Sequence, residues 1–238
     1  MFSLRIGSKA IITALAAVLL FANFAAAQIS GLCNTGETAK TALGCTGVLV
    51  TPNPTGGGPN RDGNWGVTFR PLSADHNPCL LPAQGFVYAW VDTPFDTWLP
   101  NSVSAASEWS SPYYGDVNGA AGWYIYKTAF RVPSVLLSGA APTGVTIDGQ
   151  FASDNAIYAI YLESPANNPR GCAPVSGQAF PVGSFEAWTT FSFTNSTALA
   201  PGADASLYFV VQNAPCDNCN HLNATGLRVE FFASSTFN

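Results

Sequence analysis

Charged residues are scarce in this chain of 238 residues, since Asp, Glu, Lys and Arg make up only 10% of it. An average soluble domain has about 25%. This scarcity excludes a coiled coil, a charge-laced helical bundle and a disordered acidic tail. Basic residues are the rarer kind, with 9 Lys and Arg against 14 Asp and Glu. Because nothing here would neutralise a phosphate backbone, nucleic acid is not an expected partner.

Residues and motifs that would mark an enzyme are also rare. Only His76 and His221 could titrate near neutral pH, and the sequence has no G-x-S-x-G, H-E-x-x-H or phosphate-binding glycine loop. Two carboxylates would suffice for a glycosidase, and Glu108, Asp154 and Glu163 are available, but nothing in the sequence sets two of them face to face. We therefore expect a non-enzyme that needs no cofactor, with a carbohydrate-active hydrolase as the remote alternative.

The longest apolar run lies at the beginning of the chain. Arg5 and Lys9 lead into apolar residues 10–24, and Ala25–Ala27 ends in an A-x-A pattern, which predicts a cleaved signal peptide over residues 1–27. No later run reaches the ~18 apolar residues that a membrane span needs. The mature chain is expected to be secreted, extracellular or periplasmic, without a membrane anchor.

All six cysteines follow the predicted signal peptide, and an even number in an exported chain favours disulfides. They are Cys33, Cys45, Cys79, Cys172, Cys216 and Cys219. Proximity in the sequence favours the pairs Cys33–Cys45 and Cys216–Cys219. Cys79–Cys172 then follows only as the remainder.

Zinc is the alternative for the Cys216-x2-Cys219 spacing, because His221 follows two residues later. A tetrahedral structural site needs a fourth ligand, and the chain offers no second close pair. We expect a disulfide there and no metal.

Eight short apolar and aromatic runs predict β-strands, at residues 65–70, 86–91, 123–132, 145–151, 157–162, 189–193, 207–212 and 227–232. In the third run, the even-numbered residues up to Phe130 share one face, and Trp123, Lys127 and Arg131 lie on the other, which is typical of a strand with one buried face. No window keeps a helical period, although residues 101–109 could supply one turn. The predicted class is all-β: an antiparallel double-sheet β-sandwich, with a jelly roll favoured over an immunoglobulin-like fold.

Residues 28–61 differ in composition from the rest. They are rich in Gly, Thr, Pro and Asn, and the run Thr51–Pro59 cannot continue a helix or a central strand. We predict an N-terminal arm or linker over residues 28–61 and one sandwich domain over residues 62–238.

Four segments resemble, in order and spacing, the galactose-binding-like jelly-roll domains of exported bacterial surface proteins. They are Trp98–Trp109, Gly122–Phe130, Ala152–Leu162 and the stretch from Trp188 to Glu230. The resemblance covers roughly residues 62–233 and implies that fold, but the fold serves ligand binding, surface structure and accessory roles alike.

Two departures from that family bear on function. Many of its members carry a PEP-CTERM sorting signal, which this sequence lacks, so a membrane-held protein is not expected. A long loop over Glu163–Gly177 replaces the tight turn that usually follows the strand holding Asp154, which indicates a remodelled loop.

Candidate ligand-binding residues lie in two places. Trp98, Glu108, Trp109, Tyr113 and Tyr114 belong to a segment rich in Ser, Pro and Gly. Flat aromatic rings on loops can stack on sugars, with polar groups binding the hydroxyls. The alternative for the two tryptophans is that they plug one end of the sandwich.

The second place is Asp154-Asn155, between two predicted strands. The structural interpretation is an Asx corner, in which the side chains bond to nearby backbone. The functional interpretation is an Asp that orders a sugar site or ligates calcium.

Together these patterns predict a secreted, non-catalytic protein whose partner is a carbohydrate, such as an exopolysaccharide or surface glycan. The alternative is a structural surface or matrix protein that acts through protein contacts and binds no small ligand.

Overall fold

The computed structural model describes residues 29–37, 45, 48–50, 60–81, 85–92, 94, 96–113, 118–163, 172–174, 183–196, 199–216 and 222–238. The predicted signal peptide lies outside these residues. The strands are β1 (Val48–Val50), β2 (Asn60–Pro71), β3 (Val87–Asp92), β4 (Trp109–Ser111), β5 (Asn118–Ala120), β6 (Gly122–Arg131), β7 (Val145–Asp154), β8 (Ala156–Glu163), β9 (Cys172–Pro174), β10 (Thr189–Asn195), β11 (Asp204–Asn213), β12 (Leu222–Ala224), β13 (Gly226–Phe231) and β14 (Thr236–Phe237). Two 3-10 turns, η2 (Pro78–Leu80) and η3 (Asn101–Val103), accompany them.

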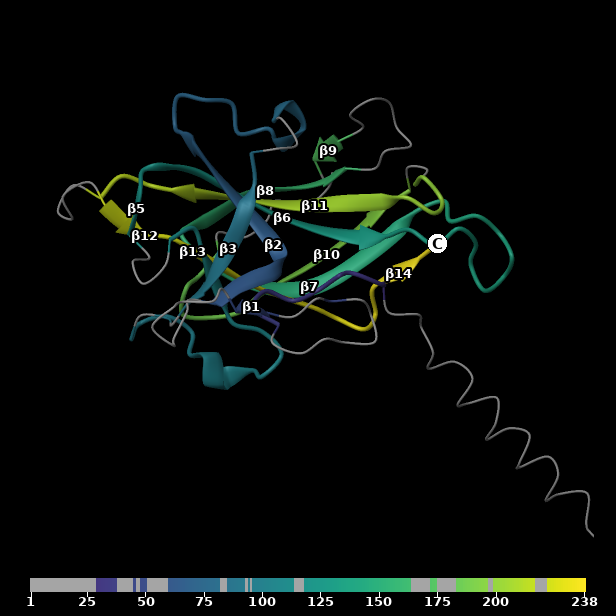
Figure 1. The fold of residues 1–238 in the computed structure, drawn as a ribbon, viewed down its shortest axis with the longest axis horizontal. Helices are drawn as coiled ribbons and strands as arrows, with labels where there is room; N and C mark the ends of the chain where they lie inside the picture. Colours follow the sequence, from purple (N-terminus) through teal and green to yellow (C-terminus); the bar gives the residue numbers. More distant parts are fainter. Residues whose placement is uncertain are drawn as a thin grey trace, which may run out of the picture.

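The fold is all-β and antiparallel, as predicted, and each of the eight predicted runs lies in or overlaps a strand. In the described part of the chain, twelve strands form one sheet in the order β10-β7-β13-β4-β3-β2-β6-β11-β8-β9, with β1 beside β2 and β14 beside β7. The sheet curls so that its two halves face each other, as Figure 1 shows for β6, β8 and β11 against β7 and β10. The two layers of the predicted sandwich are therefore joined through β3 and β4. A small separate sheet pairs β5 with β12.

The core between the two halves follows from alternation along the strands. On β6, Tyr124, Tyr126 and Phe130 point inward and are buried, as predicted from the sequence. The rings of Phe191 on β10 and Phe209 on β11 meet across the core with centroids 5.7 Å apart. Burial of such apolar surface, at about 25 cal/mol per Å², is what stabilises the sandwich.

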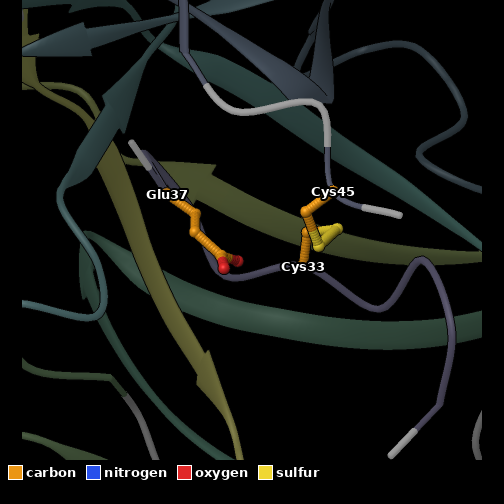
Figure 2. Close-up of side chains that lie close together, drawn as sticks. All are labelled: Cys33, Glu37 and Cys45. Atoms are coloured by element: carbon orange, nitrogen blue, oxygen red, sulfur yellow. A yellow bond between two sulfur atoms is a disulfide. The ribbon is translucent and has the colours of Figure 1, made fainter. Parts of the chain in front are cut away.

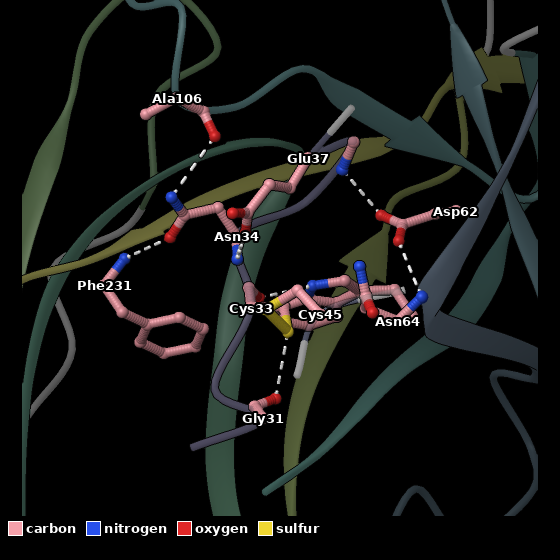
Figure 3. Close-up of a disulfide and its surroundings, with 11 residues drawn as sticks. Gly31, Cys33, Asn34, Glu37, Cys45, Asp62, Asn64, Ala106 and Phe231 are labelled. Carbon is pink, nitrogen blue, oxygen red and sulfur yellow. Dashed lines mark hydrogen bonds between the residues drawn. A yellow bond between two sulfur atoms is a disulfide. The ribbon is translucent and has the colours of Figure 1, made fainter. Parts of the chain in front are cut away.

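The N-terminal segment is part of this core and not a separate linker. Ile29 and Leu32 are buried in the core cluster, and the backbone N–H of Thr35 donates to Val229 O at 3.1 Å. Asp62 on β2, labelled in Figure 3, accepts the Gly36 N–H at 2.6 Å. The predicted boundary at residues 61/62 therefore does not separate the described residues before it from the sandwich.

A disulfide joins Cys33 and Cys45, as predicted, and Figure 2 shows it beside Glu37. Cys79 and Cys216 are also disulfide-bonded. Their predicted partners are Cys172, of which only the backbone is described, and Cys219, which lies outside the described residues. β9, which begins at Cys172, packs next to η2, which holds Cys79, so the fold is compatible with the predicted bridge.

We expect the mature protein to have no thiol that can be alkylated when it is denatured without reductant, because the described cysteines are oxidised and an exported chain favours three bridges. Mass spectrometry after alkylation checks this. Two labelled cysteines per chain would contradict it.

Candidate functional site

The predicted stacking residues Trp98 and Trp109 lie inside the protein. They are 2% and 0% exposed, and their rings pack 4.3 Å apart. Each indole N–H is bonded, from Trp98 Nε1 to Asp154 Oδ2 and from Trp109 Nε1 to Leu99 O, both at 2.8 Å. Buried rings offer no face to a sugar, so the structure corrects the stacking interpretation and matches the alternative, in which they plug one end of the sandwich.

Asp154 and Asn155 form the corner between β7 and β8. The Asn155 amide nitrogen lies 2.8 Å from Asp154 Oδ1 and 2.9 Å from Asn213 Oδ1, and Asn155 Oδ1 accepts from Asn223 Nδ2 at 3.0 Å. These side chains bond mainly to one another and to backbone, which ties the β5–β12 sheet to the main one. This geometry agrees with a structural corner, and a ligand-binding role for the pair stays a prediction.

The other predicted residues do not join this corner in one site. Glu108 lies under the N-terminal segment, where its backbone N–H donates to Thr35 O at 2.9 Å. Tyr113 is exposed, with its ring 6.4 Å from that of Tyr124. Tyr114 lies outside the described residues. The predicted ligand-binding residues therefore lie in three separate parts of the structure and do not form one site.

An aromatic platform, which we define as His76, Trp123 and Tyr158, lies on the outer face of the sheet half that contains β6, β11 and β8. The His76 ring lies 4.6 Å from Trp123 and 4.5 Å from Tyr158, and the Trp123 and Tyr158 centroids are 4.9 Å apart. Tyr158 is 52% exposed, whereas Trp123 is only 8% exposed. The platform thus presents an open tyrosine ring supported by two further rings.

The platform is held by backbone features on both sides. The β8–β11 register shifts between Ala159 and Ile157, which leaves Tyr158 as the extra residue of a bulge, and bulges re-aim side chains. His76 lies in a turn where Asp75 Oδ1 accepts the Asn77 N–H at 2.8 Å, directly before η2. The rings are therefore positioned before any ligand arrives.

Polar side chains border the platform. Arg70 on β2 and Gln212 on β11 both pair with Trp123 in the sheet register, and directly paired residues share a face. The Trp123 Nε1 makes no hydrogen bond with the described residues. An exposed ring flanked by planar hydrogen-bonding groups is the composition that small-molecule and sugar sites use.

No family model and no curated protein matches the sequence. Among solved structures, the enzymatically active domain of bacteriophage CBA120 tailspike protein 4 is 6% identical, with a TM-score of 0.34 over 74% of this chain. This chain spans 20% of that protein's length. TmCBM61, solved in complex with β-1,4-galactotriose, is 10% identical, with a TM-score of 0.31 over 71% of this chain and 86% of its own. These scores are too low to assign a family or a ligand.

One further cluster has the composition of a metal site. Among the described residues, only Cys33, Glu37 and Cys45 bring three potential ligand atoms within 4.8 Å of one another. Figure 2 shows that both sulfurs are used in the disulfide, and the Glu37 carboxylate accepts the Asn34 N–H at 3.1 Å. The cluster is therefore a disulfide with a neighbouring carboxylate.

The platform was not predicted, although one signal for it exists in the sequence. The alternation along residues 123–131 sets Trp123 on the same face as Lys127 and Arg131, which predicts that this face is exposed to solvent. In the structure the first part of that face is covered, since Trp123 and Ile125 belong to a second buried cluster. Nothing in the sequence indicates that His76, 47 residues earlier in the chain, packs on that ring.

In the described part of the chain, no helix is long and apolar enough to span a bilayer.

Proposed function

We propose that this is an exported, non-catalytic protein that binds a carbohydrate through the aromatic platform. The observation that carries the proposal is the half-exposed Tyr158 ring, fixed by His76 and Trp123 and bordered by Arg70 and Gln212. A pyranose ring would stack its C–H face on Tyr158, and its hydroxyls would bond to the polar rim. The disulfides fit the oxidising compartment that export implies.

The alternative is a matrix protein that acts through protein contacts alone. The two functions predict different migration of the protein in a native gel that contains a soluble polysaccharide. Migration should be retarded by at least one polymer from a panel of galactan, dextran, hydroxyethyl cellulose and alginate. A matrix protein without a glycan site would migrate unchanged in all of them.

Tyr158→Ala is expected to weaken that retardation at least tenfold, since a lost stacking contact of about 1.4 kcal/mol is a tenfold change in affinity. Tyr158→Phe keeps the ring and should retain most of the affinity. Tyr88→Ala is the matched control, because Tyr88 is 49% exposed on β3 and lies outside the platform. Equal retardation of Tyr158→Ala and the control would contradict the proposal. Release of reducing ends from the polymer that retards the protein would favour a hydrolase.

A further inference from the structure

A hollow of about 310 Å³ lies on the outer face of the other half of the sheet, over β7 and β10. It is lined by Asp148, Thr190, Phe191, Ser192, Phe232 and Ser234. Ligand pockets have roughly 300–1,000 Å³, so this one suits a single sugar residue better than a larger group.

The lining supplies one carboxylate, several hydroxyls and an open ring. Asp148 Oδ1 accepts from the Ser192 hydroxyl at 2.5 Å, while the described residues offer Asp148 Oδ2 no donor. Among the described residues, the hydroxyls of Thr190 and Ser234 also have no hydrogen-bond partner. Phe232 is 38% exposed. A carboxylate oxygen and free hydroxyls beside an aromatic ring match the alternating polar and apolar surface of a pyranose.

The hollow is preorganised by the turn that follows β13. The Phe232 N–H donates to Asp148 O at 2.8 Å, and the Ser235 N–H donates to Phe232 O at 3.0 Å. The Ser235 hydroxyl in turn accepts the Asp148 N–H at 3.0 Å. A site whose groups are already fixed loses little entropy when it binds.

We propose that this hollow is a second carbohydrate site, which binds one pyranose unit with Phe232 under the ring and Asp148 Oδ2 accepting a sugar hydroxyl. The inference rests on the proposed function, because it assigns the same class of ligand. The core lies between this hollow and the aromatic platform, so the two sites face away from each other. One molecule would then join two polysaccharide chains, with the gain in avidity that two sites give.

Calorimetric titration tests the inference, with a tetrasaccharide cut from the polymer that retards the wild-type protein as the probe. The wild type should bind two per chain, and Tyr158→Ala and Phe232→Ala one each. Thr190→Trp should also bind one, because it fills the hollow from an exposed position on β10 without removing a packed side chain. The wild type alone should increase light scattering from a dilute solution of the intact polymer.

The outcomes separate the two proposals. One site in the wild type, lost in Tyr158→Ala and kept in Phe232→Ala and Thr190→Trp, would overturn the second site and leave the proposed function standing. One site lost only in Phe232→Ala and Thr190→Trp would support the hollow and overturn the platform. No binding of any polymer by the wild type would overturn both.

Discussion

Arg228→Ala is expected to lower the free energy of unfolding by about 3–5 kcal/mol, because it removes a buried guanidinium and breaks the hydrogen-bond network around it. Arg228 on β13 is 0% exposed. Its Nε donates to the Ser107 hydroxyl at 2.8 Å, and its two terminal nitrogens reach five carbonyl oxygens of the segment before β4. Those oxygens belong to Leu99, Pro100, Asn101, Ser104 and Ser107. Without the guanidinium, buried carbonyls would lose their donors.

The matched control for this variant is Arg131→Ala. Arg131 forms a single ion pair with Asp204 at 3.1 Å, and both side chains are mostly exposed, so its removal should cost less than about 1 kcal/mol. Arg228→Lys should lie in between, because an ammonium keeps the charge but lacks the planar fork of donors. Urea unfolding measures all three. A loss in Arg228→Ala no larger than in the control would show that the segment is held by other contacts.

The protein is expected to become more stable as the pH falls from about 7 to about 4.5, which is the reverse of ordinary acid denaturation. Burial raises the pKa of both Asp62 and Asp154 from 3.8 to about 6. Hydrogen bonds from Gly36 to Asp62 and from Trp98 to Asp154 oppose this effect without cancelling it. Burial also raises the pKa values of Glu37 and Glu108.

The direction follows from proton uptake. Above pH 6 both carboxyls are ionised in the folded and the unfolded chain, and the folded state carries the cost of burying the charge. Between pH 6 and 3.8 the folded protein holds protons that the unfolded chain has released, so stability rises as pH falls and levels off below 3.8. A shift of about two pKa units corresponds to at most about 3 kcal/mol for Asp62, which is fully buried, and to less for Asp154, which keeps some access to solvent.

Asp154→Asn tests this assignment, since an amide cannot ionise. Its unfolding free energy should rise less than that of the wild type between pH 7 and pH 4.5, by up to about 2 kcal/mol. Asp204→Asn, which removes an exposed carboxylate, is the control and should parallel the wild type. A wild-type stability that falls steadily with acid, with both variants parallel to it, would contradict the role of the buried carboxyls.

Strands such as β7 and β10 could be predicted because they alternate between a buried and an outer face, and β11 and β13 because they are short apolar runs; both signals are local in the sequence. Trp98 and Trp109 could not be placed from the sequence, because a segment rich in Ser and Pro is compatible with both a surface loop and a plug. The plug depends on partners far along the chain: Trp98 bonds to Asp154, 56 residues away.

The candidate site also depends on contacts between residues that are far apart in the sequence. Tyr158 faces outward beside Trp123 only because a bulge in β8 re-aims it and a turn carries His76 onto both rings. Arg228 has an ordinary strand position, yet a loop closes over it. The N-terminal segment has the composition of a linker but supplies Ile29 and Leu32 to the core. Contacts between segments distant in the sequence determine where each of these residues lies, and such contacts cannot be predicted from local composition.

The indole N–H signals in a nitrogen–proton correlation NMR spectrum test the central claim most directly. The chain has 6 Trp residues, and Trp123→Phe identifies the signal of Trp123. When the tetrasaccharide from the retarding polymer is added in increasing amounts, the Trp123 signal should shift until the site is saturated. The reason is that the sugar stacks on Tyr158, whose ring lies beside that of Trp123. The signals of Trp98 and Trp109 should not shift, because their indole N–H groups are hydrogen-bonded inside the end of the sandwich. Shifts of Trp98 and Trp109 with an unmoved Trp123 would place the sugar at the Asp154 corner and contradict the platform.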